Sequence, residues 1–387
     1  MSLTEVTGDS ELVRNCMSRF PMRHNSLQLA VMLSACALAF AGCTRSAGTG
    51  GGKIRIAYIG LTCEAPIFVA YEKGYFKEEG ADVELVKTDW DSMKDGLGLG
   101  RFDATHTLVA YVLKPIEQGL DVKITGGIHK GCLRIQAGLK TNIHRIEDLR
   151  GKRIATSNMG SPPFIFANRA LAAHGFDVTR DVTWVVYPAD AVELALDNNQ
   201  IDAVADSEPI GTMLLEHKKV RTIFDEAIDP PFNEEYCCVV SLSGQFAAEN
   251  PKGAAAVTRA LLRAAKWVGE NPTAAAKLSV EKRYLASTVE FNSAAISKLT
   301  YEPAVSKCRE GLIYQAQDLK RAGLLNASTD PAELIRRAWL PLDTVTDQWV
   351  AGLKAEHVAG GGPLPADKAL AALLEEKPCC SRCCLGG

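Results

Sequence analysis

The 387-residue sequence lacks the short motifs that mark the common catalytic sites. It contains no Gly-x-Ser-x-Gly nucleophile motif, no phosphate-binding P-loop and no His-Glu-x-x-His zinc motif, and no pair of carboxylates is placed for proton transfer. Positive charge is not in excess either. A net charge of −3 and a pI near 6.2 exclude the electrostatic footprint of a nucleic-acid-binding protein. We therefore expect a binding protein rather than an enzyme, with no cofactor and no resident metal ion.

The N-terminal region lacks a hydrophobic run long enough to span a membrane comfortably. Its apolar stretch covers residues 27–40 and is followed by small residues. Arg19, Arg23 and His24 place positive charge in front of it. A short apolar stretch between a basic segment and small residues is typical of a secretory signal peptide.

The end of this stretch resembles a bacterial lipobox. Phe40-Ala41-Gly42-Cys43 would make Cys43 the lipidated first residue of the mature protein; the alternative is a plain signal peptide with an incidental cysteine. We expect residues 1–43 to form the signal peptide and residues 44–52, rich in Gly and Ser, to form a flexible tether. The mature protein would then lie outside the cytoplasm, lipid-anchored to the membrane surface.

The body of the chain opens with a strand–helix–strand pattern. Residues 54–59 alternate as a buried strand, and Pro66 is well placed to start a helix that ends at Gly74. Residues 82–86 alternate again as a second strand. Such a unit predicts a parallel sheet whose functional loop follows the carboxyl end of its first strand.

Two segments carry a family resemblance. Gly74-Tyr75-Phe76-Lys77-Glu78-Glu79-Gly80 after this first helix, and the short helix and strand of residues 146–155, resemble the substrate-binding proteins of nitrate/sulfonate/taurine-type ABC importers. The same pattern occurs in the related thiamine-pyrimidine synthase family. The resemblance covers about residues 53–354.

The resemblance implies an α/β fold of the two-lobed periplasmic-binding-protein type II, with two parallel-sheet lobes joined by two crossing strands. The expected segments are residues 53–135 for the first part of lobe 1, 136–238 for lobe 2, 239–356 for the second part of lobe 1 with the C-terminal helices, and 357–387 for a linker, a short helix and a cysteine-rich tail.

In such a fold the ligand lies between the lobes, against loops that follow the carboxyl ends of strands. The helix starts after Ala65 and Gly160 are candidate anion sites, because free backbone N–H groups point out of a helix N-terminus. Asp206 and Glu208 favour an amine or another N–H donor; the alternative is that they cap the helix that begins at Pro209. The expected ligand-binding residues are Thr62, Cys63, Trp90, His106, Thr107, His129, Ser157, Gly160, Ser161, Asp206, Glu208 and Cys237.

Cysteines gather on the hinge side of the predicted cleft, at Cys63, Cys132, Cys237 and Cys238. Three interpretations remain open. The cysteines are buried small hydrophobic residues, or Cys132 pairs with Cys237 or Cys238 as a disulfide in an oxidising compartment. In the third, they are soft metal ligands together with a nearby histidine, His106 or His129.

By resemblance, the expected function is capture of a small organic anion or zwitterion, such as a sulfonate or a taurine-like molecule. The partner would be an ABC permease in the membrane, and the protein would act as a monomer without nucleic acid. One alternative ligand is a thiamine-pyrimidine precursor stacked on Trp90. The alternative from another class is a synthase-like enzyme that uses the cysteines and histidines to hold iron.

Overall fold

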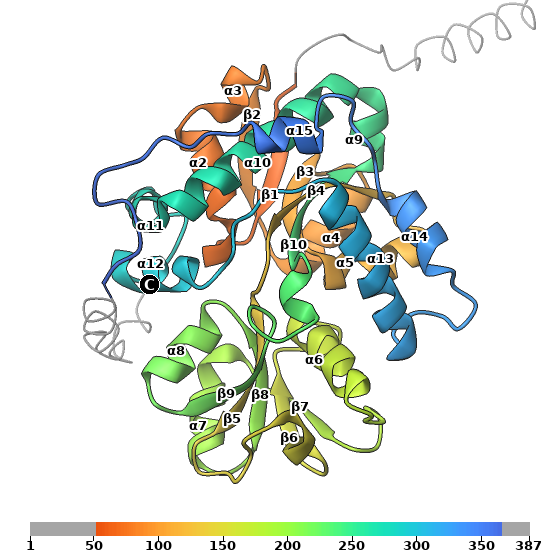
Figure 1. Ribbon diagram of the computed structural model, residues 1–387, viewed down its shortest axis with the longest axis vertical. Helices are drawn as coiled ribbons and strands as arrows, with labels where there is room; N and C mark the ends of the chain where they lie inside the picture. The colour runs from red at the N-terminus through yellow and green to blue at the C-terminus, as the bar shows by residue number, and fades with distance from the viewer. Residues whose placement is uncertain (1–51, 366–387) are drawn as a thin grey trace, which may run out of the picture. The chain divides into compact units, whose positions relative to one another are not determined.

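Two five-stranded sheets organise the chain in the computed structural model, which describes residues 52–365 (Figure 1). The first sheet has the order β2-β1-β3-β10-β4 and the second the order β7-β6-β8-β5-β9. The strands of the first sheet are β1 (Ile54–Tyr58), β2 (Val83–Lys87), β3 (Ala104–Leu108), β4 (Val122–His129) and β10 (Cys238–Ser243). Those of the second are β5 (Leu133–Gly138), β6 (Arg153–Thr156), β7 (Thr183–Val186), β8 (Ala203–Ser207) and β9 (Val220–Asp225).

Each sheet is mixed, because one antiparallel strand is inserted among parallel ones. β10 runs antiparallel to β3 and β4, and β5 runs antiparallel to β8 and β9. The expectation of two parallel-sheet lobes is therefore corrected in this detail. The inserted strand arrives from the other lobe, at the edge where its neighbours end, so it must run in the opposite direction.

The chain passes between the sheets twice, as expected for two crossing connections. β4 ends at His129 and β5 begins at Leu133, so residues 130–132 form the first connector. The second connector lies between β9 and β10, after Asp225. The lobe boundaries expected at 135/136 and 238/239 fall inside β5 and β10 respectively.

Helices flank both sheets (Figure 1). Those of the first lobe are α2 (Ala65–Glu72), α3 (Tyr75–Glu78), α4 (Trp90–Gly98), α5 (Val109–Glu117), α9 (Gly244–Glu249), α10 (Pro251–Glu270), α11 (Pro272–Glu281), α12 (Val289–Ser297), α13 (Ser306–Arg321), α14 (Pro331–Ala338) and α15 (Asp347–Ala351). Those of the second lobe are α6 (Pro162–Ala173), α7 (Val192–Asp197) and α8 (Ile210–Glu216). Short 3-10 turns are η2 (Thr62–Glu64), η3 (Ile146–Leu149), η4 (Ala189–Ala191) and η5 (Phe232–Glu234).

Helices α10 and α11 each begin at an Asn-Pro pair. The Asn250 side chain accepts a hydrogen bond from the Gly253 N–H, and Pro251 occupies the first turn of α10. Both features favour a helix start, because the cap satisfies a free N–H and proline has no N–H to lose. Asn271 and Pro272 repeat the pattern at α11, although there the asparagine side chain bonds to Trp267 and Glu356 carbonyls instead.

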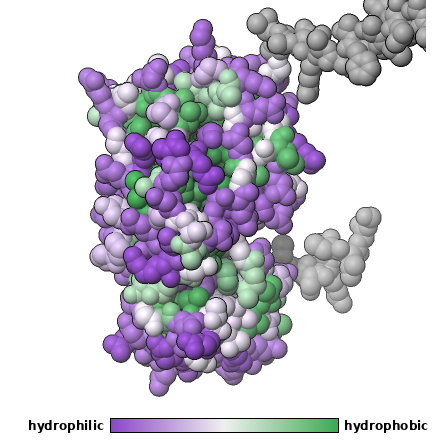
Figure 2. Space-filling model, turned by 90° about the vertical axis from the view of Figure 1, so that its right-hand side faces the viewer, coloured by the Kyte–Doolittle hydropathy of each residue, from purple (hydrophilic) through white to green (hydrophobic). Residues whose placement is uncertain are grey.

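In residues 52–365 no helix combines the length and the apolar character that crossing a membrane requires. On the face in Figure 2, hydrophobic residues form patches that hydrophilic residues interrupt. The predicted signal peptide, the lipobox cysteine Cys43 and the cysteine-rich tail lie outside the described residues, and they remain predictions.

A buried arginine links helices of the two lobes. Arg169 of α6 donates to both carboxylate oxygens of Glu235 at 2.9 and 2.7 Å, and it contacts Asp318 of α13 at 3.3 Å. Its guanidinium also lies over the Phe232 ring. Arg169 is 2% exposed and Glu235 5% exposed, so each charge depends on the other for compensation.

Replacement of this arginine should destabilise the fold strongly. We expect Arg169→Ala to lower the free energy of unfolding by about 3–5 kcal/mol, because it leaves a buried carboxylate without its cation. Urea unfolding of the full chain measures the effect. The matched control is Arg180→Ala, whose ion pair with Asp177 is exposed and should change the unfolding little. Equal effects of the two substitutions would contradict this account of Arg169.

Candidate functional site between the two sheets

Thiols and an imidazole converge where the first sheet meets the connectors. Cys63 lies in η2, His129 ends β4 and Cys238 begins β10, directly opposite His129 in the strand register. Their Sγ and ring nitrogen atoms all lie within 4.8 Å of one another. Cys132, on the first connector, hydrogen-bonds through its thiol to Cys63 and Cys238. We call Cys63, His129, Cys132 and Cys238 the thiol–imidazole cluster.

The cysteines in residues 52–365 are free thiols in this structure. Cys237 is buried beside the cluster, with its Sγ 3.8 Å from that of Cys238. Hydrogen bonds from the thiols of Cys237, Cys238 and Cys63 lower the pKa of Cys132 well below its usual value. Because donors that point at a sulfur favour its charged form, Cys132 is the thiol most ready to become a thiolate.

Two buried histidines carry unpartnered nitrogens. The ring of His106, on β3, lies 5.2 Å from that of His129, which in turn lies 5.0 Å from the Tyr301 ring. No ring nitrogen of His106 or His129 has a hydrogen-bond partner among the described residues. Burial lowers the pKa of both imidazoles, so both are neutral and each offers one donor and one acceptor.

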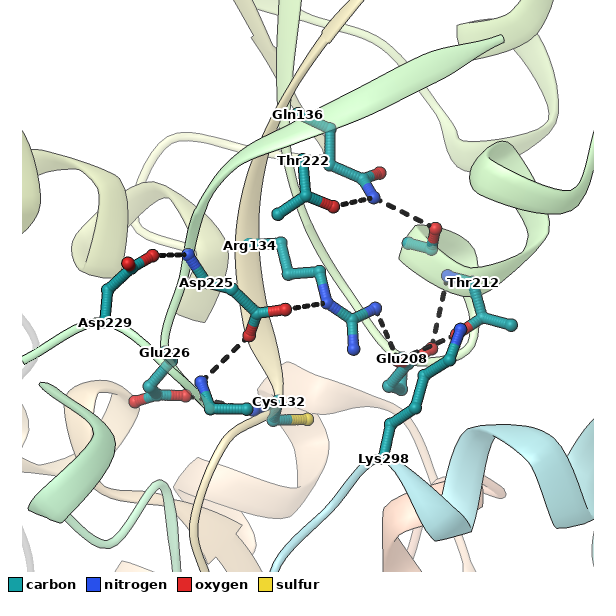
Figure 3. Close-up of polar contacts among 12 residues, drawn as sticks. Cys132, Arg134, Gln136, Glu208, Thr212, Thr222, Asp225, Glu226, Asp229 and Lys298 are labelled. Atoms are coloured by element: carbon teal, nitrogen blue, oxygen red, sulfur yellow. Dashed lines mark hydrogen bonds and ion pairs between the residues drawn. The ribbon is translucent and has the colours of Figure 1, made fainter. Parts of the chain in front are cut away.

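On the second sheet, an arginine organises the acidic side of the site (Figure 3). Arg134 of β5 donates from Nε to Asp225 at 2.8 Å and forms an ion pair with Glu208 at 2.5 Å. Glu208 also accepts hydrogen bonds from the hydroxyl and backbone N–H of Thr212. Glu208 thus caps the start of α8, the alternative that its sequence position allowed, and its carboxylate already has protein partners.

Asp206 lies within β8, two residues before Glu208, and its environment differs. Both carboxylate oxygens of Asp206 lack a hydrogen-bond partner among the described residues, and the side chain is 4% exposed. Burial raises the pKa of Asp206 well above the usual carboxyl range. An unpartnered buried carboxyl group is costly unless a ligand or proton satisfies it.

A lysine from the first lobe reaches this acidic side. Lys298, after α12, donates from Nζ to the Thr212 hydroxyl at 3.0 Å (Figure 3). The contact joins α8 of the second lobe to α12 of the first. Burial lowers the pKa of Lys298. Lys298 and Arg134 were not among the predicted site residues, because a single cation in a strand or after a helix gives no local sequence signal.

The backbone donors of the loop after β1 bind a side chain of the protein itself. The Glu64 carboxylate accepts hydrogen bonds from the backbone N–H groups of Ile59, Gly60 and Leu61, at 2.7–3.1 Å. These bonds favour the ionised form, but burial dominates and raises the pKa of Glu64 to about 7. These donors precede α2, so they are not the N–H groups of the helix start after Ala65, and the anion site expected there stays a prediction.

The second predicted anion site, at the start of α6, has few donors. Pro162 and Pro163 have no N–H, and the Phe164 N–H donates to the Ser161 hydroxyl. The expectation of free N–H groups after Gly160 is therefore wrong, since two prolines remove them. Ser157 and Gly160 are exposed, whereas Ser161 is buried and bonded to Thr156.

The remaining predicted residues have mixed environments. Thr62 donates its hydroxyl to Asn292 of α12 at 2.8 Å, while the buried Thr107 hydroxyl has no partner among the described residues. Trp90 is partly buried, and its ring packs edge-to-face on Tyr111 at 5.2 Å. Of the predicted set, Cys63, His106, His129 and Cys237 thus gather with Cys132 and Cys238 in one buried region.

Comparison with known proteins identifies relatives. The nitrate/nitrite binding protein NrtA of Synechococcus elongatus is 24% identical over 279 residues, covering 63% of this chain and 62% of that protein. NrtA of Nostoc sp. is 23% identical over 268 residues, covering 63% of this chain and 59% of the relative. The matched part therefore spans less than two thirds of each relative.

Solved structures share the fold. The alkanesulfonate-binding protein SsuA from Xanthomonas axonopodis, bound to MOPS, superposes with a TM-score of 0.61 at 16% identity, over 76% of this chain and 100% of that one. The periplasmic nitrate-binding protein NrtA from Synechocystis gives 0.60 at 18% identity, over 74% and 86%. These likenesses confirm the predicted two-lobed periplasmic-binding-protein fold.

The model of the NMT1-like family matches residues 49–281, which is more than half of the 387-residue sequence. The match includes both predicted family segments and every predicted ligand-binding residue, and it agrees with the two relatives and with the fold. The chain belongs to the NMT1-like family.

Proposed function

We propose that this protein is the extracytoplasmic solute-binding component of an ABC importer of the nitrate/sulfonate type. It would capture a small organic anion or zwitterion, of the sulfonate or taurine kind, between its lobes and present it to a membrane permease. Family membership and relatives named as binding proteins support this function, and support a binding role rather than an enzymatic one. A lipid anchor at Cys43 and a monomeric state belong to the same proposal.

One observation carries the proposal: polar groups without partners are buried on strands of both sheets. His106 and His129 belong to the first sheet and Asp206 to the second. All three interact electrostatically with Cys132 on the first connector, so they surround one region. A bound solute would supply the hydrogen-bond partners that these groups lack.

The chemistry of these groups favours a zwitterion over a simple inorganic anion. Backbone donors after β1 are taken by Glu64, and prolines remove donors at α6. Among the predicted site residues, the donors without partners are the neutral imidazoles and the Thr107 hydroxyl. Asp206 is complementary to an ammonium group, because a carboxylate accepts N–H donors. An aminosulfonate such as taurine combines both groups.

The thiamine-pyrimidine alternative depends on stacking against Trp90. That ring already packs on Tyr111, so this residue provides no specific support for a pyrimidine. Ligand capture itself would follow from lobe closure: a solute with contacts to both lobes stabilises the closed arrangement. The interlobe contact of Lys298 with Thr212 belongs to that closed arrangement.

A thermal-shift screen of the full chain tests the ligand. We expect taurine or a related aminosulfonate at a hundred times its Kd to stabilise the protein by about 2.7 kcal/mol, with nitrate and bicarbonate inactive. Asp206→Asn should weaken the aminosulfonate at least tenfold but not a plain alkanesulfonate, since only the amine contact is lost. Asp190→Asn, an exposed acid of the same lobe, is the matched control. The ligand assignment fails if no sulfonate shifts the transition, or if Asp206→Asn leaves taurine binding unchanged.

The affinity for such a zwitterion should rise with pH. Burial raises the pKa of Asp206 well above the usual carboxyl range, so the carboxyl group of the free protein stays protonated to a higher pH. An ammonium group binds its ionised form. Binding therefore releases a proton, and the affinity increases until Asp206 is ionised in the free state. Calorimetric titrations between about pH 5 and about pH 8 measure the slope. In Asp206→Asn the profile should be flat, and an unchanged slope in that variant would assign the pH dependence to another group.

A further inference from the structure

The thiol–imidazole cluster has the donor set and the spacing of a metal centre. The Sγ atoms of Cys63 and Cys238 and a ring nitrogen of His129 lie within 4.8 Å of one another. In a tetrahedral zinc site, Zn–S bonds of about 2.3 Å place two sulfurs about 3.8 Å apart, and Zn–N bonds are slightly shorter. Small side-chain rotations would bring the three donors to that spacing.

These thiols are not ordinary buried cysteines. Cys308 of α13 provides the comparison: it is fully buried among apolar residues, and its raised pKa is due to burial alone. In the cluster, by contrast, the thiols hydrogen-bond to one another, and both His129 nitrogens lack partners. Buried imidazole without a hydrogen bond is costly, and a metal ion would remove that cost.

We propose that the thiol–imidazole cluster binds a thiophilic d10 metal ion, Zn²⁺ or Cu⁺, through Cys63, Cys238 and His129, with Cys132 as the fourth ligand. Thiolate and imidazole are the ligands that these ions prefer. The sequence analysis expected no metal ion. The proposal instead adopts the metal-ligand interpretation of the cysteines that the sequence left open, because the tertiary structure brings together donors from three separate segments of the chain.

The surroundings of the cluster are polar and buried. The Cys132 thiol hydrogen-bonds to the thiols of Cys63 and Cys238, which places it beside the three donors as a fourth ligand. Glu226 accepts a hydrogen bond from the Cys132 backbone N–H at 3.1 Å (Figure 3) and so fixes the position of this connector residue. Glu64 and Asp206 add two further buried carboxyl groups near these thiols.

The position of the ligands implies a mechanical role for the ion. Cys132 lies on the first connector between the sheets, and Cys238 lies at the end of the second. An ion bound to both would tie the two connectors to the first lobe and restrict their movement. This inference goes beyond the proposed solute-binding function, and it stands whether or not the solute is a sulfonate.

Metal titration of the reduced full chain tests the proposal. Cys379, Cys380, Cys383 and Cys384 of the tail are replaced by serine, so that they do not compete. We expect one equivalent of Co²⁺ to give the visible ligand-field bands of a tetrahedral site and a sulfur-to-cobalt charge-transfer band, both abolished by Zn²⁺ or Cu⁺. Cys63→Ala, Cys238→Ala and His129→Ala should each weaken binding at least tenfold. Cys308→Ala, the matched control, should bind as the parent does.

Several outcomes would overturn the proposal. An octahedral Co²⁺ spectrum together with no binding of Zn²⁺ or Cu⁺ would do so, and so would unchanged affinity in folded Cys63→Ala and Cys238→Ala. If those variants do not fold, X-ray absorption of the Zn²⁺-loaded parent decides: sulfur and nitrogen neighbours support the site, and oxygen neighbours alone reject it. A disulfide within the cluster, in protein isolated from its own compartment, would also reject it. Solute binding is measured separately on chelator-treated protein, so the two proposals fail independently.

Discussion

The exchange of one antiparallel strand between the two sheets is the constraint on which the rest of the structure depends. Because β5 and β10 enter their sheets from the opposite lobe, both connectors leave from the edge where the parallel strands end. The register of β10 on β4 then sets Cys238 opposite His129. Residues far apart in the sequence are thereby forced into one buried region, where water cannot satisfy their polar groups.

In that region, several charged side chains are paired with other groups of the protein. Glu64 takes the backbone donors after β1, and Arg134 is held between Asp225 and Glu208. What remains unpartnered is neutral or weakly acidic: two imidazoles, a hydroxyl and the Asp206 carboxyl. Such a set suits a solute with both an acid and an amine. The adjoining thiols suit a soft cation. The two proposals share His129, which either donates to the solute or binds the metal ion, while His106 and Asp206 belong to the solute proposal alone.

The site could be predicted in part. His106, His129 and Asp206 were expected because the sequence pattern places each near the end of a strand. The structure puts His106 in the middle of β3 and buries all three without protein partners. The anion site at the start of α6 was misjudged for a local reason, since two prolines follow Ser161. Arg134 and Lys298 gave no signal, because their partners Glu208 and Thr212 come from a distant segment.

The sequence by itself determined the alternation of strands and helices, because hydrophobic periodicity, helix caps and proline positions act within a few residues. The two-lobed organisation was expected from the family resemblance. The sequence also determined which residues stand near strand ends. Only the tertiary structure decided which of those side chains have hydrogen-bond or ion-pair partners within the protein and which lack them. Whether a buried carboxylate has a cation, or a thiol has other thiols beside it, depends on strand register and on the packing of one lobe against the other. The cysteines show this most clearly: Cys308 and Cys238 are equally buried, and only their neighbours distinguish an apolar filler from a candidate ligand.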